Sequence, residues 1–257
     1  MDILRKELNE IYLSQNLDDE YLDGKIIDDF RHSIQNMVEI NNACSVITDA
    51  SSDHCYVYAG AVANLIGWSE EGRLCCDIDS SDEDFIYNCL HPEDLPEKRL
   101  LEYEFFKYID SLSGDDKLRF KATCRIRMRD RTGKYVWIDN STQILCPSPK
   151  GKIWLILCCY DLSPNQIPCE GIFPCIKNNF TGEIMVMSFG ERKKRLLSER
   201  EKEILSMIKD GKSSKMIADL LKISVHTVSR HRQNIIEKLC VSNTFEAITA
   251  ARDMLLI

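Results

Sequence analysis

The sequence lacks several signals that would place it in a specialised class of protein. Its longest strongly apolar run, residues 153–159, is far shorter than the roughly 20 residues that cross a bilayer. No apolar stretch follows the first residues to suggest a secretion signal. With 11 glycines and 7 prolines in 257 residues, the chain is neither collagen-like nor of low complexity. We therefore expect a globular, cytoplasmic protein without membrane contact.

Cysteine is plentiful, but it lacks the spacing of a ligand set. The chain has 12 cysteines and no Cys-x-x-Cys pair, so zinc-finger and thioredoxin-type chemistry are not indicated. In a reducing compartment such residues are mostly small buried apolar groups, and we expect no metal site and no structural disulfide. The cysteines on predicted strands are expected to be buried: Cys124, Cys146, Cys158 and Cys159.

Positive charge is also scarce overall. The formal net charge is -8, which argues weakly against a nucleic-acid partner because phosphates attract Lys and Arg. Residues 191–257, however, hold 14 Lys/Arg and 9 Asp/Glu, a balance of +5. Residues 1–190 hold 19 basic and 32 acidic residues, a balance of -13. Such asymmetry can mark a nucleic-acid-binding segment, and an acidic remainder would limit its non-specific binding.

The pattern of apolar residues divides the rest of the chain into three parts. Residues 1–41 read as a helical extension, either a cap on the next domain or a dimer-forming helix. Residues 42–163 read as strands and helices that end in an antiparallel meander, because short turns join the last three strands. Residues 164–195 read as a proline-marked linker, with a short hairpin of 172–176 and 184–187 inside it. The strands predicted in the second part are 45–48, 55–58, 117–129, 134–146 and 152–161, and its helices are 61–66 and 100–112.

Four short helices are predicted in residues 196–257. Ser198 stands three residues before Glu201 and forms a capping box with it. Ser213 and Ser224 begin the second and third helices, and Asn243 begins the fourth. The second helix, a tight turn and the third helix make a helix-turn-helix, whose second member enters the major groove of DNA.

The third of these helices has two distinct faces. At about 100° per residue, one side gathers an apolar stripe and the other a polar one. Arginine reads guanine and glutamine reads adenine through paired hydrogen bonds, so the polar side suits base recognition. A small helical bundle with a solvated polar face is the alternative. The apolar side holds Val228, His231, Ile235 and Leu239, and the polar side holds His226, Ser229, Arg230, Gln233 and Glu237.

Several stretches of the four predicted helices share one pattern: 197–205 (LSEREKEIL), Gly211, Ile217-Ala218, 224–231 (SVHTVSRH) and 235–239 (IIEKL). Together they closely resemble the LuxR/GerE-type DNA-binding domain. The resemblance implies that Ser229, Arg230 and Gln233 read bases in two half-sites bound by a homodimer. It places Thr227 and Lys238 beside the DNA backbone. Lys212, Lys215 and Lys222 either contact phosphate or only aid solubility. The resemblance places these fourth-helix residues at the dimer contact: Phe245, Ile248, Ala251 and Arg252.

The order of elements in residues 43–163 resembles a PAS domain. The motifs that carry it are HPEDL at 91–95, the arginine-rich 125–130, GKYVW at 133–137 and YDLS at 160–163. The resemblance implies an α+β fold in which a PAS-like antiparallel sheet with helices precedes the all-α helix-turn-helix domain. It also implies a sensor or a dimerisation module. Fold does not decide the ligand, so the cofactor stays unknown, and a small-molecule ligand is one alternative.

Together these features predict a transcription regulator in which a PAS-like domain controls a helix-turn-helix. Two alternatives remain: a phosphorelay output protein, which needs a receiver domain with a parallel sheet, and a regulator that acts through protein contact with a ligand-free PAS-like module. An enzyme is not expected, because no nucleophile–base pair, phosphate loop or metal motif is visible.

Overall fold

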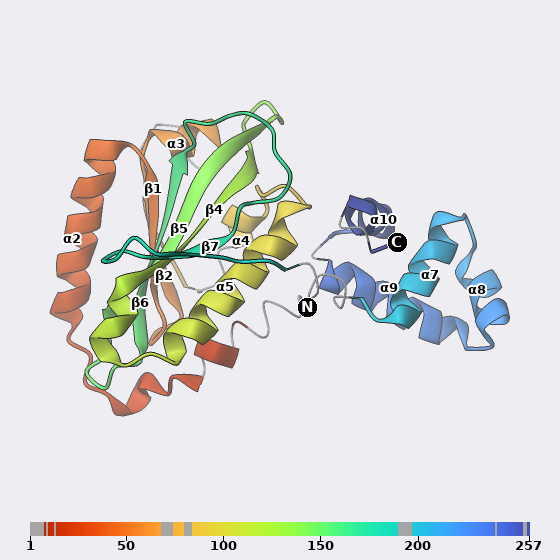
Figure 1. Cartoon of the computed structure of the whole chain (residues 1–257), viewed down its shortest axis with the longest axis horizontal. Coiled ribbons are helices and arrows are strands. Elements are labelled where there is room, and N and C mark those ends of the chain that lie inside the picture. Colours follow the sequence, from red (N-terminus) through yellow and green to blue (C-terminus); the bar gives the residue numbers. More distant parts are fainter. Residues whose placement is uncertain are drawn as a thin grey trace.

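A computed structural model describes residues 8, 10–12, 14–67, 74–79, 84–189, 197–239, 241–253 and 256–257. Figure 1 shows a lobe built on a β-sheet and a group of four C-terminal helices. The strands are β1 (Cys44–Asp49), β2 (His54–Ala59), β3 (Leu74–Ile78), β4 (Phe120–Arg129), β5 (Tyr135–Pro147), β6 (Ile153–Leu162), β7 (Cys175–Asn178) and β8 (Ile184–Val186). The helices of the sheet lobe are η1 (Leu17–Asp19), α2 (Gly24–Asn41), α3 (Ala61–Leu65), α4 (Asp84–Tyr87), α5 (Asp94–Asp110) and η2 (Gly114–Arg119). The C-terminal helices are α7 (Glu199–Lys209), α8 (Ser214–Leu221), α9 (Val225–Lys238) and α10 (Thr244–Asp253).

The sheet has eight strands in the order β3-β2-β1-β6-β5-β4-β7-β8. Every strand pairing in the described chain is antiparallel. The α+β class and the antiparallel meander β4–β5–β6 are therefore confirmed, and this sheet is not the parallel sheet of a receiver domain. Strand β3 was not expected from the sequence. It has five residues, and within the described parts of the chain it pairs with β2 alone, at an edge of the sheet.

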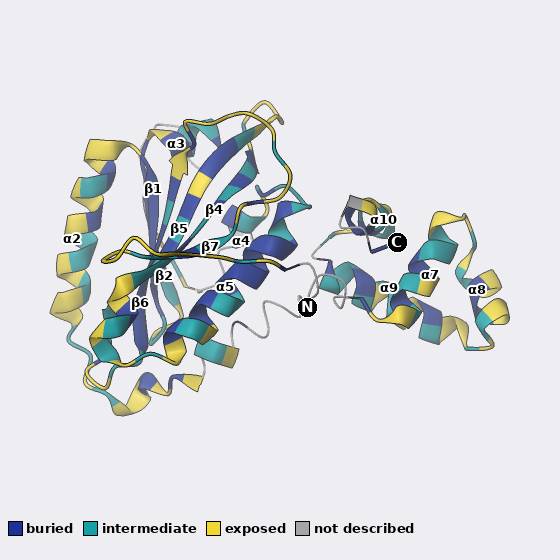
Figure 2. Cartoon of the chain, viewed as in Figure 1, coloured by how far each residue is buried: buried dark blue, intermediate teal, exposed yellow. Residues whose placement is uncertain are grey.

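Helices cover the two faces of the sheet unequally. On one face, α5 packs Leu101 and Phe105 into a large apolar core. On the other face, α2 packs Ile34 and Val38 into a smaller cluster that contains Ile47. Figure 2 shows α5 with buried residues toward the sheet and α2 with exposed residues toward solvent. The burial of Ile34 and Val38 on the sheet agrees with the capping alternative for α2, while Ile40 at its C-terminal end is 83% exposed.

Three boundaries differ from the sequence prediction. Helix α5 begins at Asp94 rather than at residue 100, and Pro96 is tolerated there because the first turn of a helix leaves its N–H groups unbonded. It ends at Asp110, so Leu112 lies outside it. A 3₁₀ turn replaces the start of the strand expected from residue 117. In that turn the Lys117 ammonium donates to the Ile109 carbonyl at 2.7 Å and so caps α5.

The hairpin expected inside the linker is part of the sheet. Strands β7 and β8 pair with each other, and β7 also pairs with β4, with Phe120 opposite Asn178. The hydrogen-bonded sheet therefore extends to Val186, well past the boundary that the sequence suggested at residue 163. Periodicity cannot show this pairing, because the partners are far apart in the chain. None of the described helices is both long and apolar enough to span a membrane.

Candidate nucleic-acid interface

Local hydrogen bonds fix where each C-terminal helix begins. Ser198 and Glu201 form the predicted capping box, in which each side chain accepts from the other residue's backbone N–H. Ser213 accepts from the backbone of Met216, and Ser224 accepts from the backbone of Thr227 at 3.0 Å. The fourth cap is also present, since Asn243 accepts from the backbone N–H of Glu246 at 3.0 Å. All four predicted start signals are confirmed.

Helix α9 shows the two predicted faces. Val228, Ile235 and Leu239 are buried in the core of the four helices. The opposite face points outward, and on it Ser229, Arg230 and Gln233 are exposed. The Gln233 amide donates to the Glu237 carboxylate at 3.1 Å, one turn along this face. The exposed face of α9 therefore presents a row of hydrogen-bonding side chains, and the opposite face of the helix is packed in the apolar core.

A residue that the sequence reasoning missed connects this helix to its neighbours. The Arg232 guanidinium donates to the Ser214 hydroxyl on α8 at 3.0 Å and to the Thr244 hydroxyl on α10 at 3.1 Å. One planar group with several donors thus fixes three helices together. Arg232 lies between the two faces described above, and no periodicity signal distinguishes such a position from a surface arginine.

Lys238, expected beside the DNA backbone, is engaged within the domain. Its ammonium donates to Glu201 Oε2 at 2.7 Å, and the Glu201 side chain is 3% exposed. Burial alone raises the pKa of Glu201, but hydrogen bonds from Lys238 and Ser198 outweigh it, so the net pKa is lowered. Thr227 is also engaged locally, since its hydroxyl lies 2.8 Å from that of Ser224. Both residues support α9 in addition to any contact outside the domain.

The remaining predicted lysines lie near the helix-turn-helix turn. Lys215 on α8 is exposed. Lys222 is exposed at the C-terminal end of α8, where its φ of 52° lets the chain turn sharply toward α9. Lys212 forms a 3.7 Å ion pair with Asp210. Lys215 and Lys222 are therefore better placed than Lys212 to meet a phosphate.

One implied set of residues needs correction. Of the α10 residues placed at a dimer contact, Ala251 is fully buried in the core and Ile248 packs against it. Phe245, 79% exposed, and Arg252 stay on the surface. Residues 247 and 251 are one turn apart and face the core together, so the outward face of α10 runs through residues 245 and 252.

The comparisons with known proteins concern this part of the chain. Residues 195–251 match the model of the family described as bacterial regulatory proteins, luxR family. The C-terminal segment is a LuxR-type helix-turn-helix domain. An Escherichia coli protein, the uncharacterized response regulatory protein YgeK, is 48% identical over 58 residues, which are 23% of this chain and 40% of YgeK. The transcriptional regulatory protein DesR of Bacillus subtilis is 46% identical over 57 residues, 22% of this chain and 29% of DesR.

Each of these likenesses spans less than a quarter of this chain, and the chain matches less than half the length of these two relatives. Among solved structures, a phage VqmA–DPO complex covers 89% of each chain at 16% sequence identity and a TM-score of 0.29. At that TM-score the likeness says nothing about function.

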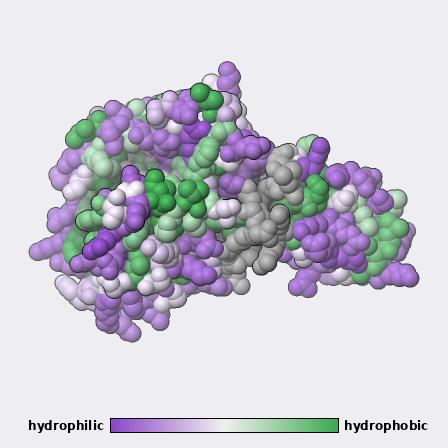
Figure 3. Space-filling model, in the orientation of Figure 1, coloured by the Kyte–Doolittle hydropathy of each residue, from purple (hydrophilic) through white to green (hydrophobic). Residues whose placement is uncertain are grey.

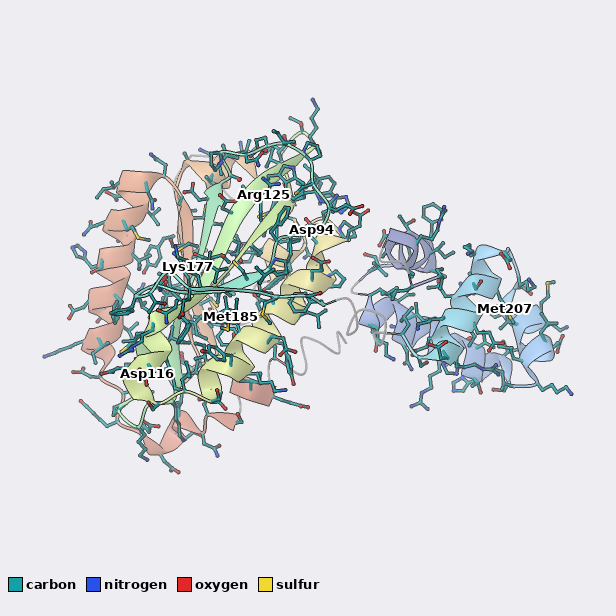
Figure 4. All side chains as sticks on the ribbon, viewed as in Figure 1. Asp94, Asp116, Arg125, Lys177, Met185 and Met207 are labelled. Atoms are coloured by element: carbon teal, nitrogen blue, oxygen red, sulfur yellow. The ribbon has the colours of Figure 1, made fainter. Side chains whose placement is uncertain are left out.

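Two of the PAS-like motifs of the sheet lobe, residues 91–95 and the arginine-rich strand β4, are joined by one ion-pair network. Arg127 on β4 donates to Asp94 Oδ1 at 2.6 Å and to Glu93 Oε2 at 2.6 Å. The backbone N–H of His91 donates to the Arg127 carbonyl at 2.9 Å. These contacts join the loop before α5 and the start of that helix to strand β4, and Figure 4 labels Asp94 at the start of α5. His91 therefore lies in the loop that leads into α5, bonded to β4 through its backbone.

A second charged group lies in the interior, between α5 and the sheet. Lys98 Nζ lies 2.9 Å from Glu102 Oε1, and both side chains are buried. The Tyr87 hydroxyl donates to the same oxygen at 2.7 Å. The pair keeps the pKa of Lys98 raised and that of Glu102 lowered against the effect of burial. The spacing of four residues on one helix was visible in the sequence, but its burial was not.

The four cysteines expected to be buried differ in their exposure. Cys124 and Cys158 are buried as expected, whereas Cys146 and Cys159 are only partly buried. Burial raises the pKa of Cys124 to about 12, so its thiol stays protonated and unreactive. The ten cysteines whose side chains the structure describes are free thiols.

The opposite face of the sheet carries a cleft beside α2. Its volume is about 490 Å3. A row of small polar side chains forms its floor, one from each of four neighbouring strands: Ser45 on β1, Cys159 on β6, Ser141 on β5 and Thr123 on β4. Each of these residues is directly opposite the next in the sheet. Charged side chains of both signs also line it: Lys121, Arg125, Asp139 and Asp161. Arg125, labelled in Figure 4, also binds the loop after β6 through the Asn165 carbonyl at 3.2 Å.

Proposed function

We propose that this protein is a sequence-specific DNA-binding transcription regulator. The carrying observation is the exposed row Ser229, Arg230 and Gln233 on α9, backed by a buried apolar stripe, in a LuxR-type domain. Arg230 and Gln233 have the donors and acceptors that distinguish base pairs in the major groove. The +5 balance of residues 191–257 supplies attraction for phosphates.

The proposed complex is a homodimer on two half-sites of double-stranded DNA. Half-sites about one helical turn apart place two recognition helices in successive major grooves. Thr227 and Lys238 would lie beside the backbone, with Lys215 and Lys222 facing phosphates on either side of the turn. The acidic sheet lobe, with residues 1–190 at -13, would weaken binding to random DNA.

The test is selection of preferred duplexes by the full chain, followed by titration of the selected site and a scrambled site at several salt concentrations. Arg230→Ala and Gln233→Ala should each weaken the selected site by roughly 1–3 kcal/mol and relax the preference at one base pair. Lys107→Ala, an exposed lysine on α5, removes a positive charge from the other lobe and serves as the control. Unchanged sequence preference in both α9 variants would show that this face does not read DNA.

For the sheet lobe we propose signal reception by a small molecule. The cleft of about 490 Å3 with charges of both signs supports this, because such a site can hold a polar ligand at both ends. The competing role is dimerisation without ligand. Native mass spectrometry of the purified full chain distinguishes them, since a retained small molecule supports reception and a bare mass under several growth conditions supports the second role.

We further propose that the protein works in the cytoplasm by binding alone, without a catalysed reaction. The relatives matched by the LuxR-type domain carry the names of regulatory proteins, which supports this role.

A further inference from the structure

Strand β8 ends the sheet with an unusually apolar edge. Ile184, Met185 and Val186 are 57%, 41% and 79% exposed. Figure 3 shows hydrophobic side chains gathered in the middle of the larger lobe, where the β7–β8 hairpin crosses it in Figure 1. Natural edge strands are normally protected by charges, prolines or bulges, because an open edge pairs with other strands. These three residues contain none of those protections.

The hydrogen bonds of the hairpin show which backbone groups of β8 are available. The Asn178 N–H donates to the Glu183 carbonyl, and the Met187 N–H donates to the Pro174 carbonyl. Residues two apart in a strand point their backbone groups the same way. Residues 183, 185 and 187 therefore face β7, while the N–H and C=O groups of Ile184 and Val186 face away from the sheet.

We propose that β8 is an interface between two copies of this chain, which pair antiparallel through it about a two-fold axis at Met185. In this register Ile184 of each copy is opposite Val186 of the other, and such a pair exchanges both N–H···O bonds. The outward N–H and C=O groups of Ile184 and Val186 are then all hydrogen-bonded to the second copy. Centring the axis on Ile184 instead would set Val186 opposite Gly182, whose N–H already donates to the Asn178 carbonyl.

The position of β8 in the chain favours a second copy over another partner. The strand leads through residues 187–196 to the LuxR-type domain, so a two-fold axis at Met185 relates two recognition helices to each other. A symmetric DNA site requires that relation. This orientation argument rests on the proposed function, whereas the edge geometry does not. Three residues a side bury far less than the roughly 1,200–2,000 Å2 of a standard interface, so the free protein pairs weakly and bound DNA holds the pair together.

The register makes a prediction that exposure alone does not. A non-hydrogen-bonded antiparallel pair has its Cα atoms about 4.5 Å apart, within disulfide range, so Met185→Cys should link to its own copy. Position 186 is more exposed, but its counterpart lies about two residues, roughly 7 Å, further along the partner strand. Val186→Cys should therefore link poorly.

The experiment oxidises each full-length variant without DNA and maps linked peptides by mass spectrometry, with the unchanged chain as background. We expect Met185→Cys to link at position 185 at least about tenfold faster than Val186→Cys links at 186, since only the first pair lies within disulfide range. Equal rates, faster linking at 186, or no linking above background would overturn the proposal. Because no DNA is present, failure of this test is separate from failure of the DNA-binding proposal.

A charge exchange checks the same axis without an introduced thiol. Met185→Lys and Met185→Glu each place like charges opposite each other, which disfavours pairing. Sedimentation of the two full-length variants, with circular dichroism to verify folding, should show less self-association of each than of the unchanged chain, and mixing the two should restore association to at least the level of the unchanged chain. A mixture that associates no better than either variant alone would contradict the two-fold at Met185.

Discussion

The Lys238 ammonium lies 2.7 Å from Glu201 Oε2, so the last turn of α9 is joined to the first turn of α7. Glu201 is also half of the capping box that begins α7. One carboxylate therefore both starts a helix and holds the helix that carries Arg230. The direction in which α9 projects depends on a contact outside the helix-turn-helix pair itself.

This contact makes stability depend on acid. The pKa of Glu201 is lowered in the folded protein, so its contribution to stability is complete above the ordinary value of 4.5 and is lost as the pH falls through the lowered value. Thermal unfolding followed from pH 6 to pH 3 should show the LuxR-type domain losing stability below about 4.5. Lys238→Met should flatten that dependence and lower stability by about 1–2 kcal/mol at neutral pH. Identical pH dependence in the two proteins would contradict this role.

Salt dependence should separate the lysines around the turn. Each phosphate contact contributes about 0.9 to the slope of log affinity against log salt. Lys215→Ala and Lys222→Ala should each reduce the slope by about 1, because both side chains are exposed. Lys238→Ala should reduce it less, since Glu201 already neutralises that ammonium. A full loss of slope at Lys238 with none at Lys215 would reverse the assignment. DNA titrations at four or more salt concentrations measure it.

Removing one partner of the interior pair Lys98–Glu102 should destabilise the fold strongly, whereas replacing both partners with apolar residues should destabilise it less. Lys98→Met leaves the buried Glu102 carboxylate without its ammonium, and we expect a loss of about 3–5 kcal/mol. Lys98→Met combined with Glu102→Leu removes both charges and should recover much of that loss. Denaturant unfolding of the two variants and the parent gives the comparison. A double variant that is less stable than the single one would show that the contacts of Glu102 with Tyr87 and with the buried Arg99 carry more of the stability than the pair with Lys98.

Gly60 is required by close backbone approach. A Cβ at this position would lie 2.4 Å from the carbonyl carbon of Asn42 and 2.5 Å from the carbonyl oxygen of Ala43. Gly60→Ala should therefore separate the end of β2 from the start of β1 and cost roughly 1–3 kcal/mol. Gly24→Ala is the control, because nothing lies within 4 Å of its Cβ. Equal stability of the two variants in denaturant unfolding would contradict the close approach.

The C-terminal domain was predictable because its signals are local. Ser198, Ser213, Ser224 and Asn243 cap within three residues of themselves, and a helical period of 3.6 separates Val228 and Ile235 from the polar side chains of α9. The resemblance to the LuxR/GerE type then assigned Ser229, Arg230 and Gln233 their expected place, and the structure exposes all three. The prediction that Ala251 lies at a dimer contact was wrong, because the family resemblance did not specify which side of α10 faces this core.

Long-range contacts were beyond the reach of the sequence. Nothing local shows that β7 pairs with β4, that Arg232 joins three helices, or that Arg127 clamps Glu93 and Asp94. Each contact joins residues far apart in the chain or on different elements, and periodicity carries no information on which elements meet.

By itself, the sequence determined the division into an acidic part and a basic helical part, the helix caps, the antiparallel meander and the two faces of α9. These follow from composition, from period and from short-range hydrogen bonding. Only the tertiary structure decided that Lys238 is engaged by Glu201, that Lys98 and Glu102 are buried together, and that Ile184 and Val186 form an open apolar edge. Burial and edge exposure depend on which elements pack side by side, and that depends on the free energy of the whole fold rather than on any one segment.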